Sequence, residues 1–169
     1  MSTDDPVSTD PSGGSFRRGV RLALDWGDAR IGVAACDRDG LIAFPVATVT
    51  AGDAAIADIA ALVGEHEPLE VLVGLPRSLS GGEGPAAVKV RAQVVRLAGA
   101  VTVPVRLVDE RLTTVTASRR LREGGKKAKQ QRSVIDAAAA VAILEHAIAL
   151  ERGRGEQPGE LVSASGGPG

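Results

Sequence analysis

A change in hydrophobic period along the chain constrains the fold more than any other feature. Residues 20–25, 30–37 and 41–49 are short apolar runs separated by turns that contain Gly and Asp, which predicts three strands joined as hairpins. After residue 52 the pattern alternates between helical spacing and short apolar runs. It predicts helices over 53–66, 86–99, 114–123 and 133–151 and strands over 70–76 and 104–109. This order predicts an α/β domain with a five-stranded mixed sheet and helices on both faces.

Two residues refine this arrangement. Pro45 has no amide hydrogen to donate within a sheet, so the strand over 41–49 is expected at a sheet edge. Asp53 precedes the first helical run and is a candidate N-cap.

The two ends of the chain differ in composition from its middle. Residues 1–18 and 153–169 are rich in Ser, Gly, Pro and acidic residues and are expected to be disordered tails around one folded domain over 19–152. The N-terminus is acidic, unlike a signal peptide, and no apolar run reaches the roughly 18 residues of a membrane span. The single Cys36 excludes an internal disulfide. We therefore expect a cytoplasmic protein without a membrane partner.

Aromatic residues are scarce, with two Phe, one Trp and no Tyr among 169 residues. The core must consist of Val, Leu, Ile and Ala. A nucleic-acid partner would find few side chains on which bases can stack, so recognition of backbone and shape is expected.

Carboxylates follow two of the predicted strands. Asp25 ends the first strand, where the alternative to a functional role is capping of the turn that follows. Asp109 and Glu110 end the strand over 104–109, and because side chains alternate along a strand, only one of them can join a shared site. Glu110 has the longer reach and is the preferred candidate, with Asp109 as the reserve.

A third carboxylate, Asp136, is expected in the first turn of the last helix. Ser133 and Asp136 fit a capping box, which would give Asp136 only a structural role. The residues after Asp136 are nevertheless apolar for more than two turns, and a carboxylate there is costly unless it faces a cleft or a cation.

If these three acids meet, their repulsion must be offset. Oxygen ligands without Cys or His suit Mg²⁺ or Mn²⁺ rather than Zn²⁺. Carboxylate-held metal ions of this kind activate water and stabilise the leaving oxygen in phosphodiester hydrolysis. Asp25, Glu110 and Asp136 are therefore candidate catalytic residues and metal ligands of a phosphodiesterase.

Basic residues gather between two of these acids. Eight of the 20 Lys and Arg residues lie within 111–132, where Glu123 is the only acid. Beside a metal site this segment is expected to bind phosphates, and the alternative is a solvated helix and loop. A second basic face, with Lys89 and Arg96, is expected on the helix over 86–99. The candidate nucleic-acid-binding residues are Arg77, Lys89, Arg96, Arg111, Arg119, Arg120, Lys126, Lys127, Lys129 and Arg132.

Four segments together resemble the YqgF/RuvX family: LALDWGDARIGVAACD, VLVGLPRSLSGGEGPAA, LVDERLTTVTASRRLREGG and DAAAAVAILEHAI. The resemblance runs in order over about residues 20–150. It implies an RNase H-like three-layer fold and a metal-dependent nuclease whose acids correspond to Asp25, Glu110 and Asp136. The chain departs from the family pattern at Trp26 and at Asp28, which follow Asp25 where a smaller turn is usual.

The resemblance implies two substrates, the 5′ end of pre-16S ribosomal RNA and the Holliday junction. We favour ribosomal RNA processing, because a resolvase needs a dimer and a wedge between the arms, and the sequence offers few wedge candidates, of which Trp26 and Leu79 are the best. Whether the protein is a monomer or a homodimer stays open. Two further alternatives are an ATP-binding protein, since DWGDARIG also resembles the phosphate-binding hairpin of the actin–hexokinase superfamily, and a non-catalytic nucleic-acid-binding module.

Overall fold

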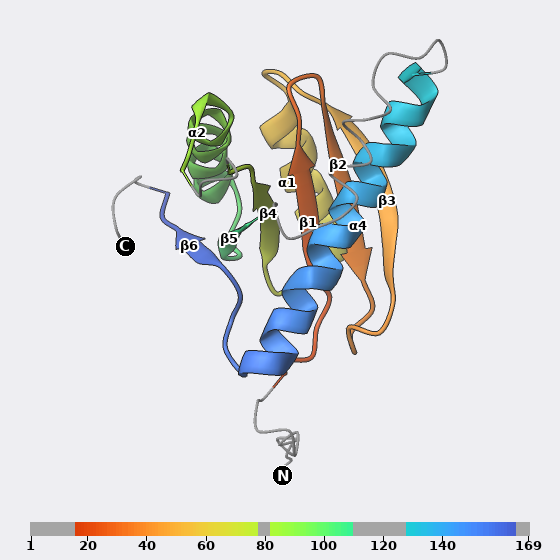
Figure 1. Cartoon of the computed structure of the whole chain (residues 1–169), viewed down its shortest axis with the longest axis vertical. Helices are drawn as coiled ribbons and strands as arrows, with labels where there is room; N and C mark the ends of the chain where they lie inside the picture. The colour runs from red at the N-terminus through yellow and green to blue at the C-terminus, as the bar shows by residue number, and fades with distance from the viewer. Residues whose placement is uncertain (1–15, 78–81, 110–127, 165–169) are drawn as a thin grey trace.

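The strands pair into one mixed sheet in the order β3-β2-β1-β4-β5-β6 (Figure 1). The computed structural model describes residues 16–77, 82–109 and 128–164, and side chains for these ranges except 128–136. The expected helix over 114–123 lies outside the described residues. The strands are β1 (Leu22–Trp26), β2 (Arg30–Cys36), β3 (Ala43–Thr50), β4 (Val71–Leu75), β5 (Val105–Asp109) and β6 (Glu160–Val162).

The direction of the strands follows the expected mixed pattern. β1, β2 and β3 form antiparallel pairs, whereas β4 is parallel to β1 and β5 is parallel to β4. β3 is an edge strand, as Pro45 predicts, and its register against β2 shifts beside the pair of Ala34 and Pro45. The carboxyl ends of β1, β4 and β5 therefore meet at one edge of the sheet, which we call the carboxyl edge; the opposite edge is the amino edge.

Helices cover both faces of the sheet and give three layers (Figure 1). α1 (Ala55–His66) and α2 (Pro85–Ala100) pack on one face, and α4 (Ala128–Arg154) crosses the other. This arrangement confirms the predicted α/β class with helices on both faces. Within the described ranges, no helix is both long and apolar enough to cross a membrane.

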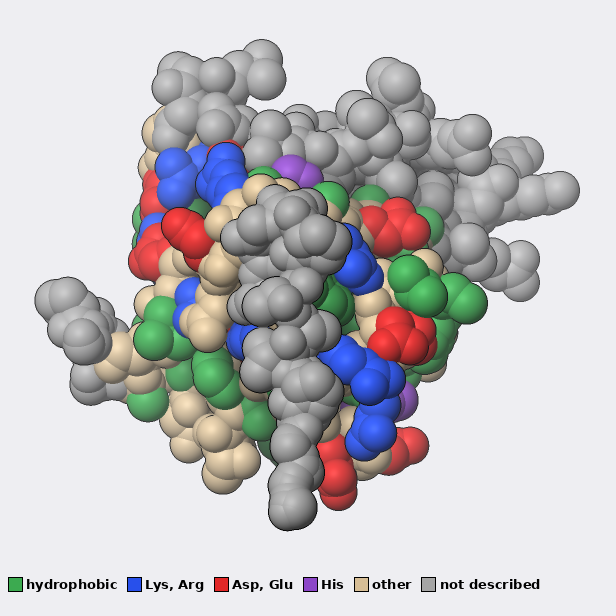
Figure 2. Space-filling view, turned by 90° about the horizontal axis from the view of Figure 1, so that it is seen from below, with side chains coloured by type: hydrophobic (Ala, Val, Ile, Leu, Met, Phe, Trp, Pro, Cys, Tyr) green, Lys and Arg blue, Asp and Glu red, His purple; other side chains and the backbone are tan. Residues whose placement is uncertain are grey.

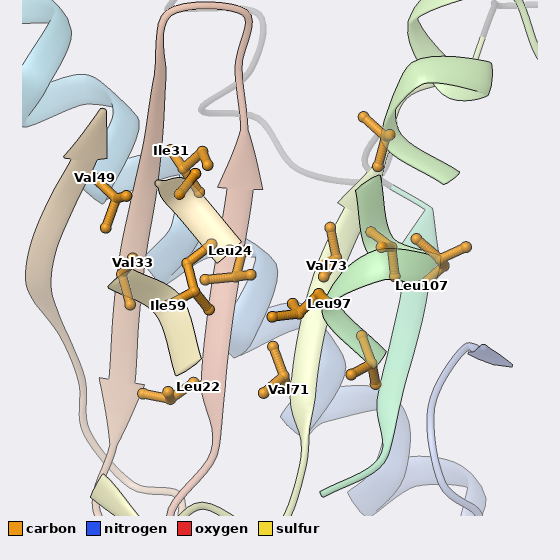
Figure 3. Close-up of a cluster of buried hydrophobic side chains, with 14 of the residues drawn as sticks. Leu22, Leu24, Ile31, Val33, Val49, Ile59, Val71, Val73, Leu97 and Leu107 are labelled. Atoms are coloured by element: carbon orange, nitrogen blue, oxygen red, sulfur yellow. The ribbon is translucent and has the colours of Figure 1, made fainter. Parts of the chain in front are cut away.

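Alternation along each strand divides the core in two. Along β1, Leu22 and Leu24 belong to the larger cluster beneath α1 and α2, together with Ile59 and Leu97 (Figure 3). Ala23 belongs to the smaller cluster beneath α4. Because the cluster under α4 contains several alanines and Cys36, this helix can lie close to the sheet. The core is aliphatic, as the aromatic-poor composition predicts.

Ordered structure extends beyond the boundary expected at residue 152. α4 continues to Arg154, and residues 160–162 form β6, which pairs with β5 and adds a sixth strand to the five expected. Arg91 of α2 holds this strand, with its Nη1 2.8 Å from Oε2 of Glu160. Composition alone suggested a tail here; pairing with an open strand edge supplies the order that the segment lacks by itself.

The expected starts of α1 and α4 are wrong in detail. The N-cap of α1 is Ala54 and makes no side-chain hydrogen bond, so Asp53 is not the cap. α4 begins at Ala128, which places Ser133 inside the helix and Asp136 in its third turn. Because a capping box requires the Ser at the helix start, this structure excludes the capping role for Asp136.

Charged side chains are buried at the amino edge, an arrangement that we call the ion cluster. Arg21, Glu70 and Glu151 are each at most 1% exposed. Arg21 Nη2 lies 3.2 Å from Glu151 Oε2, and Arg17 Nη2 lies 2.9 Å from Glu70 Oε2 and 2.8 Å from Glu151 Oε1. Arg106 Nε approaches Glu70 Oε1 at 3.3 Å. The ion cluster therefore joins the starts of β1, β4 and β5 to the C-terminal end of α4.

Phe16 adds an aromatic contact beside the ion cluster. The guanidinium carbons of Arg21 and Arg152 lie 4.4 and 4.0 Å from the centre of its ring. These are cation–π distances. The residues just before Gly19 are thus fixed on α4.

We predict that Glu70→Gln lowers the free energy of unfolding by about 3 kcal/mol, because it leaves Arg17 and Arg21 with only one of their two carboxylates and removes the carboxylate beside Arg106. Urea unfolding at neutral pH measures the loss. Glu65→Gln, on the exposed side of α1, is the matched control and should change stability by less than about 0.5 kcal/mol. Equal stability of the two variants would contradict a stabilising role for the ion cluster.

A second prediction concerns pH. Burial acts to raise the pKa of Glu151, but the hydrogen bonds and charges of Arg17 and Arg21 outweigh it and hold the pKa below its usual value. A carboxyl group with a lower pKa in the folded than in the unfolded state stabilises the fold above its unfolded pKa, about 4.3. That stabilisation is lost as the pH falls through the folded pKa.

We therefore expect the stability difference between wild type and Glu151→Gln to be largest near pH 7 and to shrink below about pH 4. Urea midpoints at several pH values measure it. A difference that stays constant down to pH 3 would show that the ionised form of Glu151 has no special role.

Candidate active site at the carboxyl edge of the sheet

Asp25 lies next to the carboxyl end of β1 and is only 2% exposed. It shares the side of the strand that carries Ala23, so its carboxylate is on the α4 face of the sheet. Its partner across the β1–β2 hairpin is Gly32. Asp25, the first of the three predicted acids, is therefore on a strand of the sheet, beneath the same helix that carries Asp136.

Glycines flank Asp25 on both neighbouring strands. Gly32 is on β2. Gly74 is on β4, directly after Val73, the residue that pairs with Leu24 of β1. Both glycines have the alternation that places a residue on the α4 face. Since neither residue has a side chain, no side chain rises from the sheet on either side of the Asp25 carboxylate at these positions, which leaves room for a ligand.

Asp109 is the last residue of β5, parallel to Leu75 of β4. Side chains alternate between the two faces along a strand. Asp109 is therefore on the face opposite Val108, which packs under α4, and on the same face as Leu107, which packs under α1 and α2. Asp109 therefore belongs to the face opposite Asp25. This supports the preference for Glu110, which itself lies outside the described residues.

The backbone places Asp136 in the N-terminal half of α4. Glu151, near the other end of this helix, pairs with Arg21 at the start of β1. Ala140, one turn after Asp136, packs in the same cluster as Ala23. Moving from Glu151 towards Asp136 therefore leads from the amino edge of the sheet towards the carboxyl edge, where Asp25 lies (Figure 1).

The convergence of the three acids stays a prediction. Where side chains are described, no group of three or more His, Cys, Asp or Glu residues lies close enough to hold a metal ion. Glu110 and the side chain of Asp136 are outside that part of the chain.

The described candidates for phosphate binding lie near the same edge. Lys89 and Arg96 are exposed on α2, as their helical spacing predicts. Arg77 follows β4 and lies 3.8 Å from the carboxylate of Glu83. Lys129 and Arg132 belong to α4, but their side chains are outside the description. The other candidates lie outside the described residues: Arg111, Arg119, Arg120, Lys126 and Lys127.

The amino edge has a different electrostatic character. Figure 2, which views the molecule from this end, shows Lys and Arg side chains interspersed with Asp and Glu. At this edge Arg18 Nε and Asp39 Oδ1 form an ion pair at 2.8 Å. A guanidinium that is neutralised by a carboxylate in this way attracts phosphate only weakly.

The structure also reveals a cleft of about 460 Å³ that the sequence did not predict. It lies between α2 and the turns that follow β1 and β3, on the face opposite Asp25. Its walls include Trp26, Asp28, Asp53, Lys89 and Arg96. The unusual turn after Asp25 was the available signal, but only the tertiary structure brings it opposite α2.

A family model described as "RuvX: Holliday junction resolvase" matches residues 19–150. The chain belongs to this family. A relative from Streptomyces coelicolor, named "Putative pre-16S rRNA nuclease", is 60% identical over 165 residues, which cover 96% of this chain and 98% of the relative. A protein of the same name from Nocardioides sp. is 54% identical and covers 87% of this chain and 98% of its own length.

Solved structures establish the fold class. The RuvC of Thermus thermophilus in complex with Holliday junction substrate superposes with a TM-score of 0.52 at 18% identity, over 85% of this chain and 99% of that one. A second RuvC structure from Thermus thermophilus gives a TM-score of 0.50 at 16% identity. The fold is RNase H-like, as the family resemblance implies.

Proposed function

We propose that this protein is a divalent-metal-dependent nuclease that hydrolyses phosphodiester bonds during 5′-end processing of pre-16S ribosomal RNA. The observation that carries the proposal is Asp25, a carboxylate 2% exposed at the carboxyl edge of an α/β sheet, beside a glycine on the hairpin strand. In open α/β sheets, ligands bind outside the carboxyl ends of the strands. Family membership, over residues 19–150, supports a nuclease activity.

The donor chemistry suits Mg²⁺ or Mn²⁺. Asp25 supplies a hard oxygen donor on a rigid strand, and the glycine beside it leaves an approach from the α4 face. Asp136 lies on α4 in its third turn, where helix capping does not account for a carboxylate in an apolar segment. The alternation of β5 predicts that the residue after Asp109 returns to the α4 face, which favours Glu110 as the third ligand.

In this proposal Asp25, Glu110 and Asp136 would hold the metal, and the chemistry it would supply there is activation of water and stabilisation of charge on the phosphate oxygens. Through that metal, the three acids would fix the position of the scissile phosphate relative to β1 and α4. Basic residues along 111–132, with Lys89 and Arg96 on α2, hold flanking phosphates as charge partners. The scarcity of aromatic residues fits recognition through backbone and shape.

The names of the relatives favour ribosomal RNA as the substrate, since proteins 54% to 60% identical are named for pre-16S rRNA. The description of the family model favours the alternative, a Holliday junction resolvase. Within the described chain there is one sheet with its helices, whereas the actin–hexokinase proteins close two lobes around ATP, which argues against the ATP-binding alternative.

Cleavage assays test the proposal directly. With Mn²⁺ or Mg²⁺, wild type is expected to cut an RNA that carries the 5′ extension of 16S rRNA, and EDTA should abolish cutting. Asp25→Asn should reduce the rate by more than about 100-fold, because even the partners that orient metal ligands contribute 10- to 100-fold. A four-way DNA junction is offered in parallel, and Arg38→Ala, at the far end of β2, is the control.

The outcomes separate the alternatives. Paired cuts in the DNA junction without any action on the RNA would replace ribosomal RNA processing by junction resolution. Full activity of Asp25→Asn would exclude the proposed site. Wild type that binds nucleic acid but does not cut it would favour a non-catalytic module.

The neighbouring acids Asp109 and Glu110 provide a further, matched prediction. Because Asp109 lies on the face opposite Asp25, Asp109→Asn should retain activity within a few-fold, whereas Glu110→Gln should lose more than about 100-fold. The two variants are matched, because each replaces a carboxylate by the corresponding amide and the two positions are adjacent. Cleavage rates at saturating Mn²⁺ measure the difference, and the reverse order of the two losses would assign the metal to Asp109.

A further inference from the structure

The cleft beside Trp26 is formed by three separate parts of the chain. The turn after β1 contributes Trp26 and Asp28, the segment between β3 and α1 contributes Asp53, and α2 contributes Lys89, Gln93 and Arg96. Its volume of about 460 Å³ is in the range of small-molecule sites. The cleft is thus large enough for a nucleotide unit.

Its two walls carry opposite charge. Lys89 and Arg96 are exposed on the α2 wall, and Asp28 and Asp53 are exposed on the wall formed by the turns. Arg96 donates from Nη1 to Oε1 of Gln93 at 3.4 Å. Among the residues that the structure describes, none of these four charged groups forms an ion pair within 4.0 Å. The cations and carboxylates therefore line one cleft without neutralising each other in ion pairs.

Trp26 gives the cleft an aromatic wall. It is half-buried, packs against the larger core cluster and is the only Trp in the chain. In a chain without Tyr, it is the one aromatic side chain that lines this cleft. Aromatic side chains that line a basic groove are platforms for stacked bases in single-stranded nucleic-acid sites.

These features match the chemistry of one kind of ligand. An unpaired nucleotide has a flat base that stacks, a phosphate that binds Lys or Arg, and, in guanine, adenine and cytosine, amino groups that donate to carboxylates. We propose that the cleft binds an unpaired nucleotide of single-stranded RNA that bears an amino-substituted base. The base stacks on Trp26 and donates to Asp28 or Asp53, and its phosphate lies against Lys89 and Arg96.

The position of the cleft links it to the proposed active site. Asp25 and Trp26 are consecutive residues of β1 that lie on opposite faces of the sheet. A strand whose scissile phosphate lies at Asp25 can cross the carboxyl edge and place a neighbouring nucleotide in the cleft. The proposal rests on the nuclease function proposed above and assigns the cleft to substrate selection rather than to cleavage.

Because the chain has one Trp, its fluorescence reports on the cleft directly. The experiment titrates full-length Asp25→Asn, which should bind without cutting, with eight-nucleotide single-stranded RNAs of mixed sequence that contain either guanosine or uridine at the central positions. Fluorescence anisotropy of labelled RNA gives the affinity, and Trp quenching reports stacking. Guanosine monophosphate alone forms a separate arm.

We expect the guanosine RNA to quench Trp26 fluorescence and to bind about tenfold more tightly than the uridine RNA. Trp26→Leu should weaken binding by roughly tenfold, whereas Trp26→Phe should retain most of it, which separates stacking from loss of fold. Lys89→Ala should weaken both RNAs, and Arg38→Ala, which removes a charge at the far end of β2, should weaken neither by more than about twofold. Asp28→Asn combined with Asp53→Asn should abolish the preference for guanosine.

Three results would overturn the inference. RNA binding without Trp quenching, together with normal cleavage by wild type, would exclude the cleft while leaving the nuclease intact. Quenching by guanosine monophosphate but not by RNA would make the cleft a site for a free nucleotide. Absence of both RNA binding and RNA cleavage in wild type would remove the proposed function and this inference with it.

Discussion

The ion cluster at the amino edge is the constraint on which the rest of the structure depends. Arg21, Glu70 and Arg106 precede or begin three adjacent strands, and Glu151 comes from the far end of α4. Buried charges are costly unless they pair, so these groups tolerate few other arrangements of helix and sheet. By fixing the C-terminal end of α4 on the start of β1, the ion cluster sets how the helix crosses the sheet.

The same strand alternation connects this cluster to the candidate site. Arg21, just before β1, is four residues from Asp25, so the two share a face, and Glu70, just before β4, shares it with Gly74. One end of this face is closed by ion pairs under α4, and the other has glycine beside a carboxylate. The stabilising ion pairs and the candidate site therefore occupy opposite edges of one surface, and α4 spans both.

β1 also separates the two proposed roles by its two faces. Asp25 lies on the α4 face, where the proposed metal chemistry takes place, whereas Trp26 lines the cleft against α2. Consecutive residues on a strand are fixed relative to each other by the backbone. A shift of the hairpin would therefore move the cleavage site and the proposed nucleotide site together, which suits an enzyme that must cut at a defined distance from a recognised base.

The sequence by itself determined the α/β class, the succession of the first five strands along the chain, the edge position of β3 and the candidate acids, because these depend on local periodicity, on Pro45 and on residue type. It also indicated that only one of Asp109 and Glu110 can face Asp25. Only the tertiary structure decided that residues 160–162 form a strand, that α4 begins at Ala128, and that Arg21 and Glu70 are buried. Those features depend on partners distant in sequence: an open strand edge, a sheet face for the helix, and opposite charges that compensate one another. The cleft has the same origin, since its walls come from segments that are joined only by folding.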